Sequence, residues 1–430
     1  MQRNAGTPLA PDGVVVCESP DPATIYCYSP GLAQWHDRLI ATTDWGGPGV
    51  ASSLDGEKAD SDWRSWQGRV YLSDDRGRTW RQTTTFPFLH ARPFVADGTL
   101  YVLGHDGDLM IIRSDDGGQT WSRPVRLTEG QQWHQAPCNV HYAHGCIYLV
   151  MECRVRRNIQ GWCVGEQAPV LMRGRLGDDL TCRENWTFAS VVSFADIIDN
   201  RADCPQLDWW GVPFYPCPYP SGTAVLGRED RRCPPIGWLE ANVVRIVNPD
   251  HIWYDPTGRT YHLWSRAHTG STGYAAVVKV VEDEPGGGAM TTQLEHAPSG
   301  KPMLYVPCPG GQVKFHVLYD EPTRLYWLLS NQATYSMTRA DRLPDGHFNL
   351  PNNERRRLQL HFSTNMIDWC FAGLVAVGEE ARASRSYASM VIDGDDLHVL
   401  SRSGDRRARN AHDVNLITFH TVRNFRSLVY

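Results

Sequence analysis

The stretch that decides the fold is Ser73-Asp74-Asp75-Arg76-Gly77-Arg78-Thr79-Trp80, which returns as Ser114-Asp115-Asp116-Gly117-Gly118-Gln119-Thr120-Trp121. Both copies read Ser-x-Asp-x-Gly-x-Thr-Trp, and each follows a short apolar run. Ser and Asp side chains can hydrogen-bond backbone N–H groups in a tight turn. Gly can adopt a positive φ where the chain reverses, and Trp can fold back under the turn as an apolar plug. The repeat therefore predicts two similar turns, each at the end of a strand.

A shortened third copy spans residues 363–369, with Asn365 in the Asp position and one residue fewer. A fainter copy begins at Asp178-Asp179-Leu180 and leads to Trp186. The motif resembles the Asp-box of sialidase-type β-propellers. In that family the box lies on turns between strands and carries no chemistry.

The rest of the chain favours one large all-β domain over residues 1–430. Gly and Pro are frequent, at 38 and 28 residues, and no long amphipathic helical pattern is visible. Strand pairs separated by turn signals predict a six-bladed β-propeller, with seven blades as the alternative. Residues 14–16 should pair in the last blade, because an open ring would leave bare strand edges. The stretch 196–235, rich in Pro, Cys and aromatic residues, is interpreted as a long loop over the propeller face.

Composition limits the partners and the compartment. A formal net charge of -6 argues against a nucleic-acid partner. No apolar run is long enough to cross a membrane. The first sixteen residues lack a signal-peptide pattern, so we expect a cytoplasmic protein, or a secreted or periplasmic one if a leader was removed. The twelve cysteines show no metal-binding spacing, and we expect no metal or cofactor.

The resemblance to sialidases extends along nearly the whole chain and implies a set of site residues. Glu240 matches the acidic residue that activates the nucleophile, and Tyr387, in Ser384-Arg385-Ser386-Tyr387, matches the nucleophile itself. Arg266 ends a strand where the family places an arginine that binds the substrate carboxylate. A Tyr hydroxyl is a poor nucleophile at neutral pH, so a nearby carboxylate is needed to accept its proton.

One position departs from the family. The arginine expected in the first blade falls near Ser29, which cannot replace a bidentate guanidinium–carboxylate contact. This departure predicts weak activity on standard sialosides, unless Arg92 or Arg64 completes the site.

Two other roles have several candidates. Asp44 is the nearest candidate for the acid/base, with Asp60 and Asp62 as further candidates in a polar insertion predicted at about residues 46–67. Arg356, Arg357 and Arg385 are candidates for the third arginine.

Histidines form a second group of candidates. His134 and His268 lie near predicted strand ends and could face the cleft, although surface or strand positions are the more common case for histidine. With Tyr387 and Arg266 they would suit a polysaccharide lyase on uronic-acid glycans. The sequence thus predicts a glycoside hydrolase that cleaves a terminal, acidic sugar from a carbohydrate substrate. A uronate lyase and a non-catalytic glycan-binding propeller are the alternatives.

Overall fold

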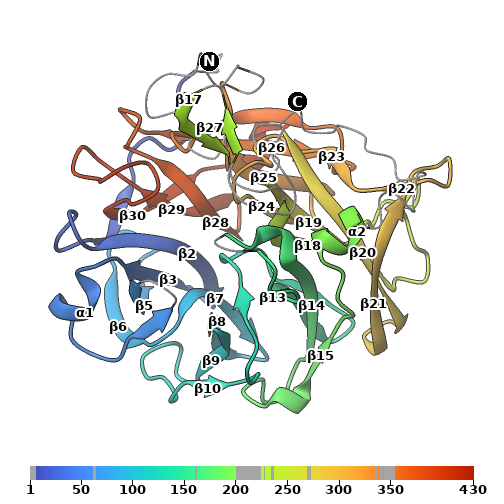
Figure 1. The fold of residues 1–430 in the computed structure, drawn as a ribbon, viewed down its shortest axis with the longest axis horizontal. Helices are drawn as coiled ribbons and strands as arrows, with labels where there is room; N and C mark the ends of the chain where they lie inside the picture. The colour runs from blue at the N-terminus through green and yellow to red at the C-terminus, as the bar shows by residue number, and fades with distance from the viewer. Residues whose placement is uncertain are drawn as a thin grey trace.

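The computed structural model describes residues 6–61, 64–159, 162–199, 224–226, 228–233, 237–268, 273–335, 338, 342 and 354–430. These residues form six antiparallel sheets around a central axis, so the predicted six-bladed propeller is confirmed and the seven-bladed alternative is wrong (Figure 1). No helix among the described residues is long and apolar enough to cross a membrane.

Each blade runs outward from the axis in chain order. The first contains β2 (Tyr26–Trp35), β3 (Arg38–Gly46), β5 (Arg64–Ser73) and β6 (Arg81–Phe86), and the second contains β7 (Leu89–Ala96), β8 (Thr99–Asp106), β9 (Asp108–Ser114) and β10 (Val125–Arg126). The third begins with a divided inner strand, β11 (Trp133–His134) and β12 (His141–Ala143), followed by β13 (Cys146–Arg154), β14 (Gln167–Arg175) and β15 (Trp186–Phe188).

The second half of the chain repeats the plan. The fourth blade contains β18 (Gly237–Val244), β19 (Thr260–His268), β20 (Tyr274–Glu284) and β21 (Gly287–His296), extended by β22 (Pro302–Met303) and β23 (Tyr305–Pro307). The fifth contains β24 (His316–Asp320), β25 (Leu325–Asn331), β26 (Arg357–Ser363) and β27 (Cys370–Val377). The sixth contains β28 (Arg385–Asp393), β29 (Asp396–Ser403), β30 (Leu416–Val422) and β1 (Val14–Glu18).

The remaining elements are short. They are α1 (Val50–Ser53), α2 (Phe194–Asp199), β4 (Ala59–Ser61), the hairpin β16 (Ala224–Leu226) and β17 (Arg228–Cys233), and the 3₁₀ helices η1 (Val164–Glu166), η2 (Arg183–Asn185) and η4 (Phe425–Leu428). α1 and β4 lie in the polar insertion expected at residues 46–67, whose last part belongs to β5. Most of the loop predicted at 196–235 lies outside the described residues, and the described part of it includes a β-hairpin.

Hydrophobic contacts between blades hold the ring together. Six hydrophobic clusters fill the six interfaces between neighbouring blades. The middle strands are buried on both faces, as in β25, where every residue is buried. Such strands have continuous apolar runs rather than alternating polar and apolar residues.

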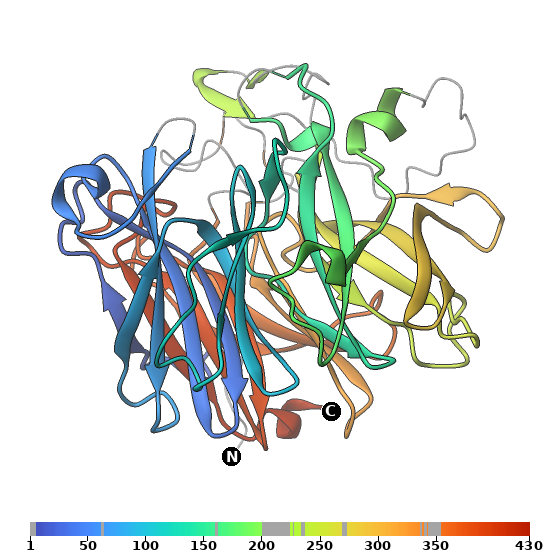
Figure 2. The same ribbon diagram turned by 90° about the horizontal axis from the view of Figure 1, so that it is seen from below.

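The N-terminal strand closes the ring, as predicted. β1 pairs antiparallel with β30, so the two ends of the chain share the sixth blade. Figure 2 shows both ends on one side of the propeller, opposite the side that carries α2 and the β16–β17 hairpin. The pairing covers the edge of β30 and joins the two ends of the chain in one blade.

The repeated motifs form turns between the third and fourth strands of their blades. In the first copy, Ser73 Oγ accepts from the Gly77 N–H at 2.8 Å, and Asp75 Oδ1 accepts from the Thr79 N–H at 2.9 Å. The second copy repeats both contacts, at 2.8 and 2.9 Å. Gly77 has a φ of 83°, and a Cβ there would meet the Phe419 ring at 2.0 Å, so this position requires glycine. The turns therefore have the predicted structural role.

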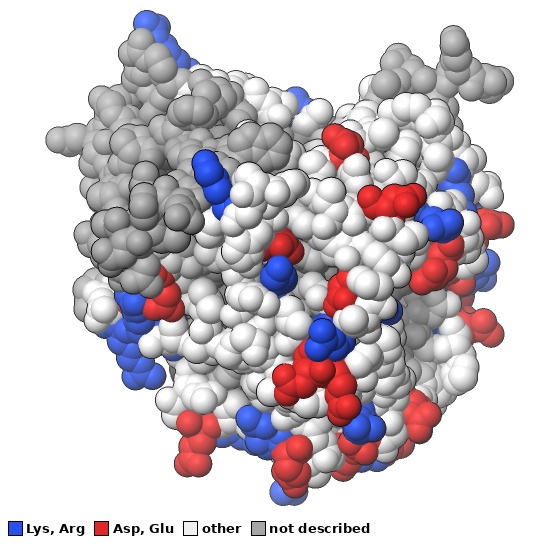
Figure 3. Space-filling view, turned by 90° about the vertical axis from the view of Figure 1, so that its right-hand side faces the viewer, with Lys and Arg blue, Asp and Glu red and all other residues white. Residues whose placement is uncertain are grey.

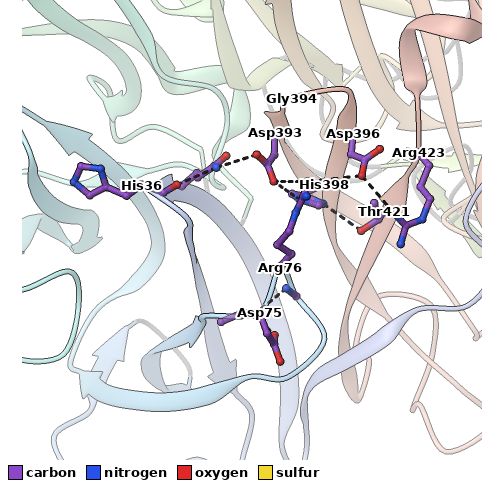
Figure 4. A network of polar contacts seen from close by, with 12 residues as sticks. His36, Asp75, Arg76, Asp393, Gly394, Asp396, His398, Thr421 and Arg423 are labelled. Atoms are coloured by element: carbon purple, nitrogen blue, oxygen red, sulfur yellow. Dashed lines mark hydrogen bonds and ion pairs between the residues drawn. The ribbon is translucent and has the colours of Figure 1, made fainter.

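The first motif also joins the two ends of the ring. Arg76 Nη2 forms an ion pair with Asp393 Oδ2 at 2.8 Å, across the interface between the first and sixth blades. Asp393 also accepts from Gln34 at 3.3 Å and contacts His398 Nε2 at 3.2 Å (Figure 4). This polar network and a hydrophobic cluster both join the first and sixth blades.

The outer flank in Figure 3 carries mixed charge. Lys and Arg side chains on this face lie among Asp and Glu side chains, without a continuous basic patch among the described residues.

Candidate active site

The inner strands of four blades carry the same backbone feature at one end of the axis. β2, β7, β18 and β28 each contain a bulge, where the register with the second strand shifts. Each bulge holds a non-glycine residue with positive φ: Ser29 at 45°, His90 at 54°, Glu240 at 61° and Tyr387 at 53°. A bulge redirects a side chain, and strained backbone of this kind concentrates at functional sites. Two predicted catalytic residues, Glu240 and Tyr387, thus occupy equivalent positions.

The second strands contribute a polar residue near the same end of the axis. In the four blades with a bulge, this polar residue pairs with the inner-strand residue immediately before the bulge. In the third blade, whose inner strand is divided, Glu152 pairs with His134. Asn331 ends the second strand of the fifth blade. All are buried, and together we call them the polar collar: Asp44, His105, Glu152, Arg266, Asn331 and Arg402. Burying a polar group costs free energy unless the group is paired or takes part in binding or catalysis. The collar therefore indicates a functional centre.

Arg266 links the predicted nucleophile to the predicted base. Its Nη1 donates to Tyr387 Oη at 2.8 Å and to Glu240 Oε2 at 3.3 Å. Its Nε donates to the Gln312 carbonyl at 2.8 Å, which fixes the guanidinium plane. The three residues come from distant parts of the chain and meet at the axis. The guanidinium stands between the phenol and the carboxylate.

Two further arginines, which the sequence interpretation missed, lie on the Tyr387 ring. The guanidinium carbon of Arg355 is 4.8 Å from the ring centroid, and that of Arg402 is 5.0 Å away. Both side chains are buried. Burial, with the charges of Arg402 and Arg266 acting in the same direction, lowers the pKa of Arg355 to about 10. Three positive charges therefore surround one tyrosine, an arrangement suited to an anion.

The third-arginine candidates lie elsewhere. Arg385 Nη1 donates to the carbonyls of Ser384 and Gly404 at 2.7 and 2.8 Å. Arg356 donates to the carbonyls of Gly378 and Glu379, and it lines a separate small cavity with Arg357. Backbone carbonyls thus hold Arg385 and Arg356, whereas their neighbour Arg355 contacts Tyr387.

Arg402 also contacts the first blade. Its guanidinium carbon lies 4.4 Å from the Tyr28 ring centroid, and its Nη2 donates to the His412 carbonyl. Tyr28 Oη donates to Asp413 Oδ1 at 2.7 Å, and His412 Nδ1 lies 2.8 Å from the same oxygen. These contacts hold Arg402 between the rings of Tyr28 and Tyr387.

Asp44 is fully buried on the collar. Its Oδ1 accepts from the His90 N–H at 3.0 Å, and its Oδ2 has no hydrogen-bond partner among the described residues. Burial raises the pKa of Asp44 to about 7, although hydrogen bonds from Ser29 and His90 oppose the rise. The carboxyl group can therefore hold a proton near neutral pH. The alternative Asp62 lies outside the described residues, as do the side chains of Asp60 and Arg64.

The histidine candidates fall into two groups. His134 packs beside His90 with ring centroids 4.9 Å apart, and His90 Nδ1 lies 2.9 Å from His105 Nε2. Among the described residues, no group of three or more His, Cys, Asp or Glu side chains is placed to hold a metal ion. His268 ends β19, and its side chain is outside the description.

Arg92 and Lys314 are buried, positively charged residues. Arg92 lies in the inner strand β7, and Lys314 lies just before the inner strand β24. None of the three guanidinium nitrogens of Arg92 has a hydrogen-bond partner among the described residues. Lys314 Nζ donates to the Ala388 carbonyl at 2.5 Å and to Ser389 Oγ at 3.2 Å. Burial lowers the pKa of Lys314 to about 8. These hydrogen bonds from Lys314 therefore stabilise the bulge that contains Tyr387.

No protein-family model matches the sequence, and a comparison with curated proteins finds no match. Solved structures do match. The alpha-L-arabinanase of Penicillium chrysogenum complexed with arabinobiose has 13% identity and a TM-score of 0.50, over 96% of this chain and 98% of that chain. The chain has the same propeller fold. The Trypanosoma rangeli sialidase in complex with sialic acid has 13% identity and a TM-score of 0.53, over 98% of this chain and 61% of that chain. A protein of unknown function from Dyadobacter fermentans has 12% identity and a TM-score of 0.53, over 95% and 97% of the two chains.

Proposed function

We propose that this propeller is a glycoside hydrolase that removes a terminal acidic sugar from a glycan. The observation that carries the proposal is the placement of Arg266 Nη1, 2.8 Å from Tyr387 Oη and 3.3 Å from Glu240 Oε2. A hydroxyl, a carboxylate and a cation lie together in one buried group, which supports the roles of nucleophile, base and stabilising charge. The fold shared with an arabinanase and a sialidase supports glycoside hydrolysis.

The first step forms a bond between Tyr387 and the sugar. The Tyr387 oxygen attacks the anomeric carbon while its proton passes through one water to Glu240, and the bond to the leaving-group oxygen breaks. The Arg266 charge stabilises the negative charge that develops on the phenolic oxygen. A neutral tyrosine suits an anionic sugar better than a carboxylate nucleophile would, because it adds no second negative charge to the attacking side.

Asp44 supplies the proton that the leaving group needs. Its raised pKa keeps it protonated at mildly acidic pH. In the second step the deprotonated Asp44 accepts a proton from water, whose oxygen attacks the anomeric carbon and releases Tyr387. The enzyme then returns to its starting protonation state.

The arginines define the substrate class. Arg355, Arg402 and Arg266 lie around Tyr387, and a sugar carboxylate beside the anomeric centre would pair with them. Ser29 is buried in the bulge of the first blade and cannot form such a pair. Arg355 and Arg402 bring positive charge from other blades, but neither occupies the Ser29 position.

The Asp44→Asn variant should change both the rate and its pH dependence. We expect kcat/KM on a natural glycoside to fall about 10²- to 10⁴-fold. The fall in kcat/KM should be much smaller for activated aryl glycosides, because their leaving groups need no proton. In the wild type, activity should decline as pH rises through about 7, where Asp44 loses its proton. A pH profile of the variant that keeps this decline would contradict the assignment.

Stability provides a second readout for Asp44. The folded-state pKa lies above the usual carboxyl value, so the stabilising effect of the protonated form is lost as pH rises toward about 7. The Asn variant lacks this loss. As pH rises from about 4 to about 7, the unfolding free energy of the variant should therefore increase relative to that of the wild type. Equal pH dependence in thermal unfolding would show that Asp44 titrates normally.

A lyase is the second candidate, favoured by the imidazole rings of His90 and His134, which lie close to the collar residue His105. Burial lowers the pKa of His90 and His105 well below the usual value, so both are neutral bases at pH 7. A lyase would use such a base to remove the proton next to a uronate carboxylate. Its product would carry a new double bond that absorbs ultraviolet light.

One assay panel separates these activities. Glycans ending in sialic acid, in a uronic acid or in a neutral sugar are incubated with the full chain, and products are followed by chromatography and ultraviolet absorption. We expect release of an acidic monosaccharide without new absorption, and weak cleavage of standard sialosides because of Ser29. New absorption would support the lyase, and release of only neutral sugars would contradict the acidic substrate.

A further inference from the structure

The four bulged strands carry a second set of equivalent residues, on the side of the bulges away from the collar. In β2, β7, β18 and β28, the residue two positions after the positive-φ residue forms the first register pair beyond the bulge. These residues are Gly31, Arg92, Asn242 and Ser389, and all four are buried. Figure 1 shows their strands around the axis, so the four residues occupy one level of it.

Groups at this level meet across the axis. The Ser389 hydroxyl of the sixth blade donates to the Pro30 carbonyl of the first blade at 2.8 Å and lies 3.2 Å from the Pro137 carbonyl of the third. The third blade stands opposite the sixth in the ring. In the fourth blade, Asn242 Nδ2 donates to the Phe315 carbonyl, just before β24, at 3.1 Å. The level is therefore one connected layer beneath the collar.

Arg92 is a positive charge in this layer without a paired anion. It is 1% exposed, and none of its three guanidinium nitrogens has a hydrogen-bond partner among the described residues. Burial lowers the pKa of Arg92, against the opposing effects of Cys138 and Glu152. Glu152 accepts from the Ala241 N–H at 3.1 Å instead, and burial keeps the Cys138 thiol neutral by raising its pKa to about 12. A buried cation left in this way is unfavourable.

Lys314 brings a second positive charge to the layer. It is also 1% exposed, and its ammonium group donates to the Ala388 carbonyl and the Ser389 hydroxyl, which carry no charge. Burial lowers the pKa of Lys314 to about 8, and the charge of Arg92 acts in the same direction, although Glu240 opposes the decrease. Lys314 is thus charged at pH 7, and the two cations repel each other.

His316 adds an uncharged donor. Its Nδ1 accepts from the Met390 N–H at 2.7 Å, so the proton of the neutral ring lies on Nε2. Burial lowers the pKa of His316 well below the usual value, and the charges of Lys314 and Arg92 act in the same direction. Among the described residues, Nε2 has no hydrogen-bond partner. It is therefore an unused N–H donor, as the guanidinium nitrogens of Arg92 are.

This donor set fits an anion and not a metal ion. All of its groups are N–H donors and two carry positive charge, whereas an anion supplies acceptor sites and the missing negative charge. The three side chains are at most 3% exposed, so the ion must be small. We propose that Arg92, Lys314 and His316 bind one small inorganic anion, of the size of chloride, on the propeller axis beneath the collar. This site is separate from the proposed hydrolase chemistry, and its test needs no substrate.

The test measures the stability of the full chain against chloride. Urea denaturation is carried out at pH 7 and constant ionic strength, with sodium gluconate replaced stepwise by sodium chloride, because gluconate is too large for a closed site. An anion that binds only the folded state should raise the folding equilibrium constant of the wild type about tenfold for each tenfold increase in chloride above its Kd. In Arg92→Met the constant should not change. Equal chloride dependence in both proteins, or none in the wild type, would overturn the proposal.

The sign of the Arg92→Met effect separates anion binding from a merely structural arginine. In gluconate alone the variant should be more stable than the wild type, because it removes a buried charge that lacks a partner and keeps most of the side-chain volume. Increasing chloride should narrow this difference and then reverse it. Arg113→Met, at a partly exposed arginine, should respond to chloride as the wild type does. A variant that is less stable by the same amount in both salts would contradict the anion site.

Bromide locates the ion directly. In crystals of the wild type grown in sodium bromide, we expect an anomalous diffraction peak within hydrogen-bond distance of the Arg92 and Lys314 nitrogens. Crystals of Arg92→Met should lack this peak and keep any bromide bound at the surface. Peaks at the surface only, or a peak that persists unchanged in the variant, would overturn the proposal.

Discussion

Tyr387→Phe should reduce turnover of the acidic glycoside by at least about 10³-fold, because the substitution removes the atom that attacks the sugar. The fold should remain intact. Tyr387 is buried, the phenyl ring keeps its contacts with Arg355 and Arg402, and the hydroxyl loses the hydrogen bond from Arg266. That loss should cost about 1 kcal/mol in unfolding free energy. Steady-state kinetics with the substrate from the panel measures the effect.

Tyr326→Phe is the matched control. Tyr326 is also buried, in β25, and its hydroxyl donates to the Arg245 carbonyl at 2.7 Å. It lies toward the opposite end of the strand from the collar residue Asn331. This variant should lose a similar amount of stability and no activity. Similar activity losses in the two variants would mean that Tyr387 has a structural role only.

Arg266→Met should destabilise the protein by about 3–5 kcal/mol, because it leaves the Glu240 carboxylate buried without its ion pair. Both side chains are at least nine-tenths buried, at 4% and 1% exposure. The cost arises mainly from the uncompensated charge. The double variant Arg266→Met/Glu240→Gln should therefore recover much of the lost stability.

Urea denaturation of the two variants and the wild type measures this coupling. A surface pair provides the control: Arg113 and Asp115 lie 2.8 Å apart and are partly exposed. Arg113→Met should cost no more than about 1 kcal/mol. If Arg266→Met stays within the same limit, the buried ion pair is not the strong interaction that its geometry indicates.

The fold could be predicted from the sequence because its signals are local. The hydrogen bonds of the Ser73 and Ser114 turns depend on residues within a few positions of each other. Ring closure by residues 14–16 followed from the need to pair strand edges. The register of the bulges was not predictable, since a positive φ at Tyr387 or Glu240 leaves no mark in the amino-acid type.

The site was only partly predictable, because contacts across the axis depend on how six blades meet. Arg402 had a signal that was overlooked: Ser401-Arg402 ends the second strand of the sixth blade as Ser265-Arg266 does in the fourth. Arg355 had none that separates it from Arg356 and Arg357. Only the folded structure shows which of these three adjacent side chains contacts Tyr387.

The central claim is that Tyr387 forms a covalent bond with an acidic sugar. The most direct measurement uses a fluorinated, activated glycoside of the sugar released in the panel, because fluorine beside the anomeric centre slows the second step. After incubation, the full chain is weighed by mass spectrometry and digested. We predict an increase of one glycosyl group per chain, located on the peptide that contains Tyr387. Modification of Glu240 or Glu152 instead, or an unmodified chain under conditions where the natural substrate is turned over, would contradict the account.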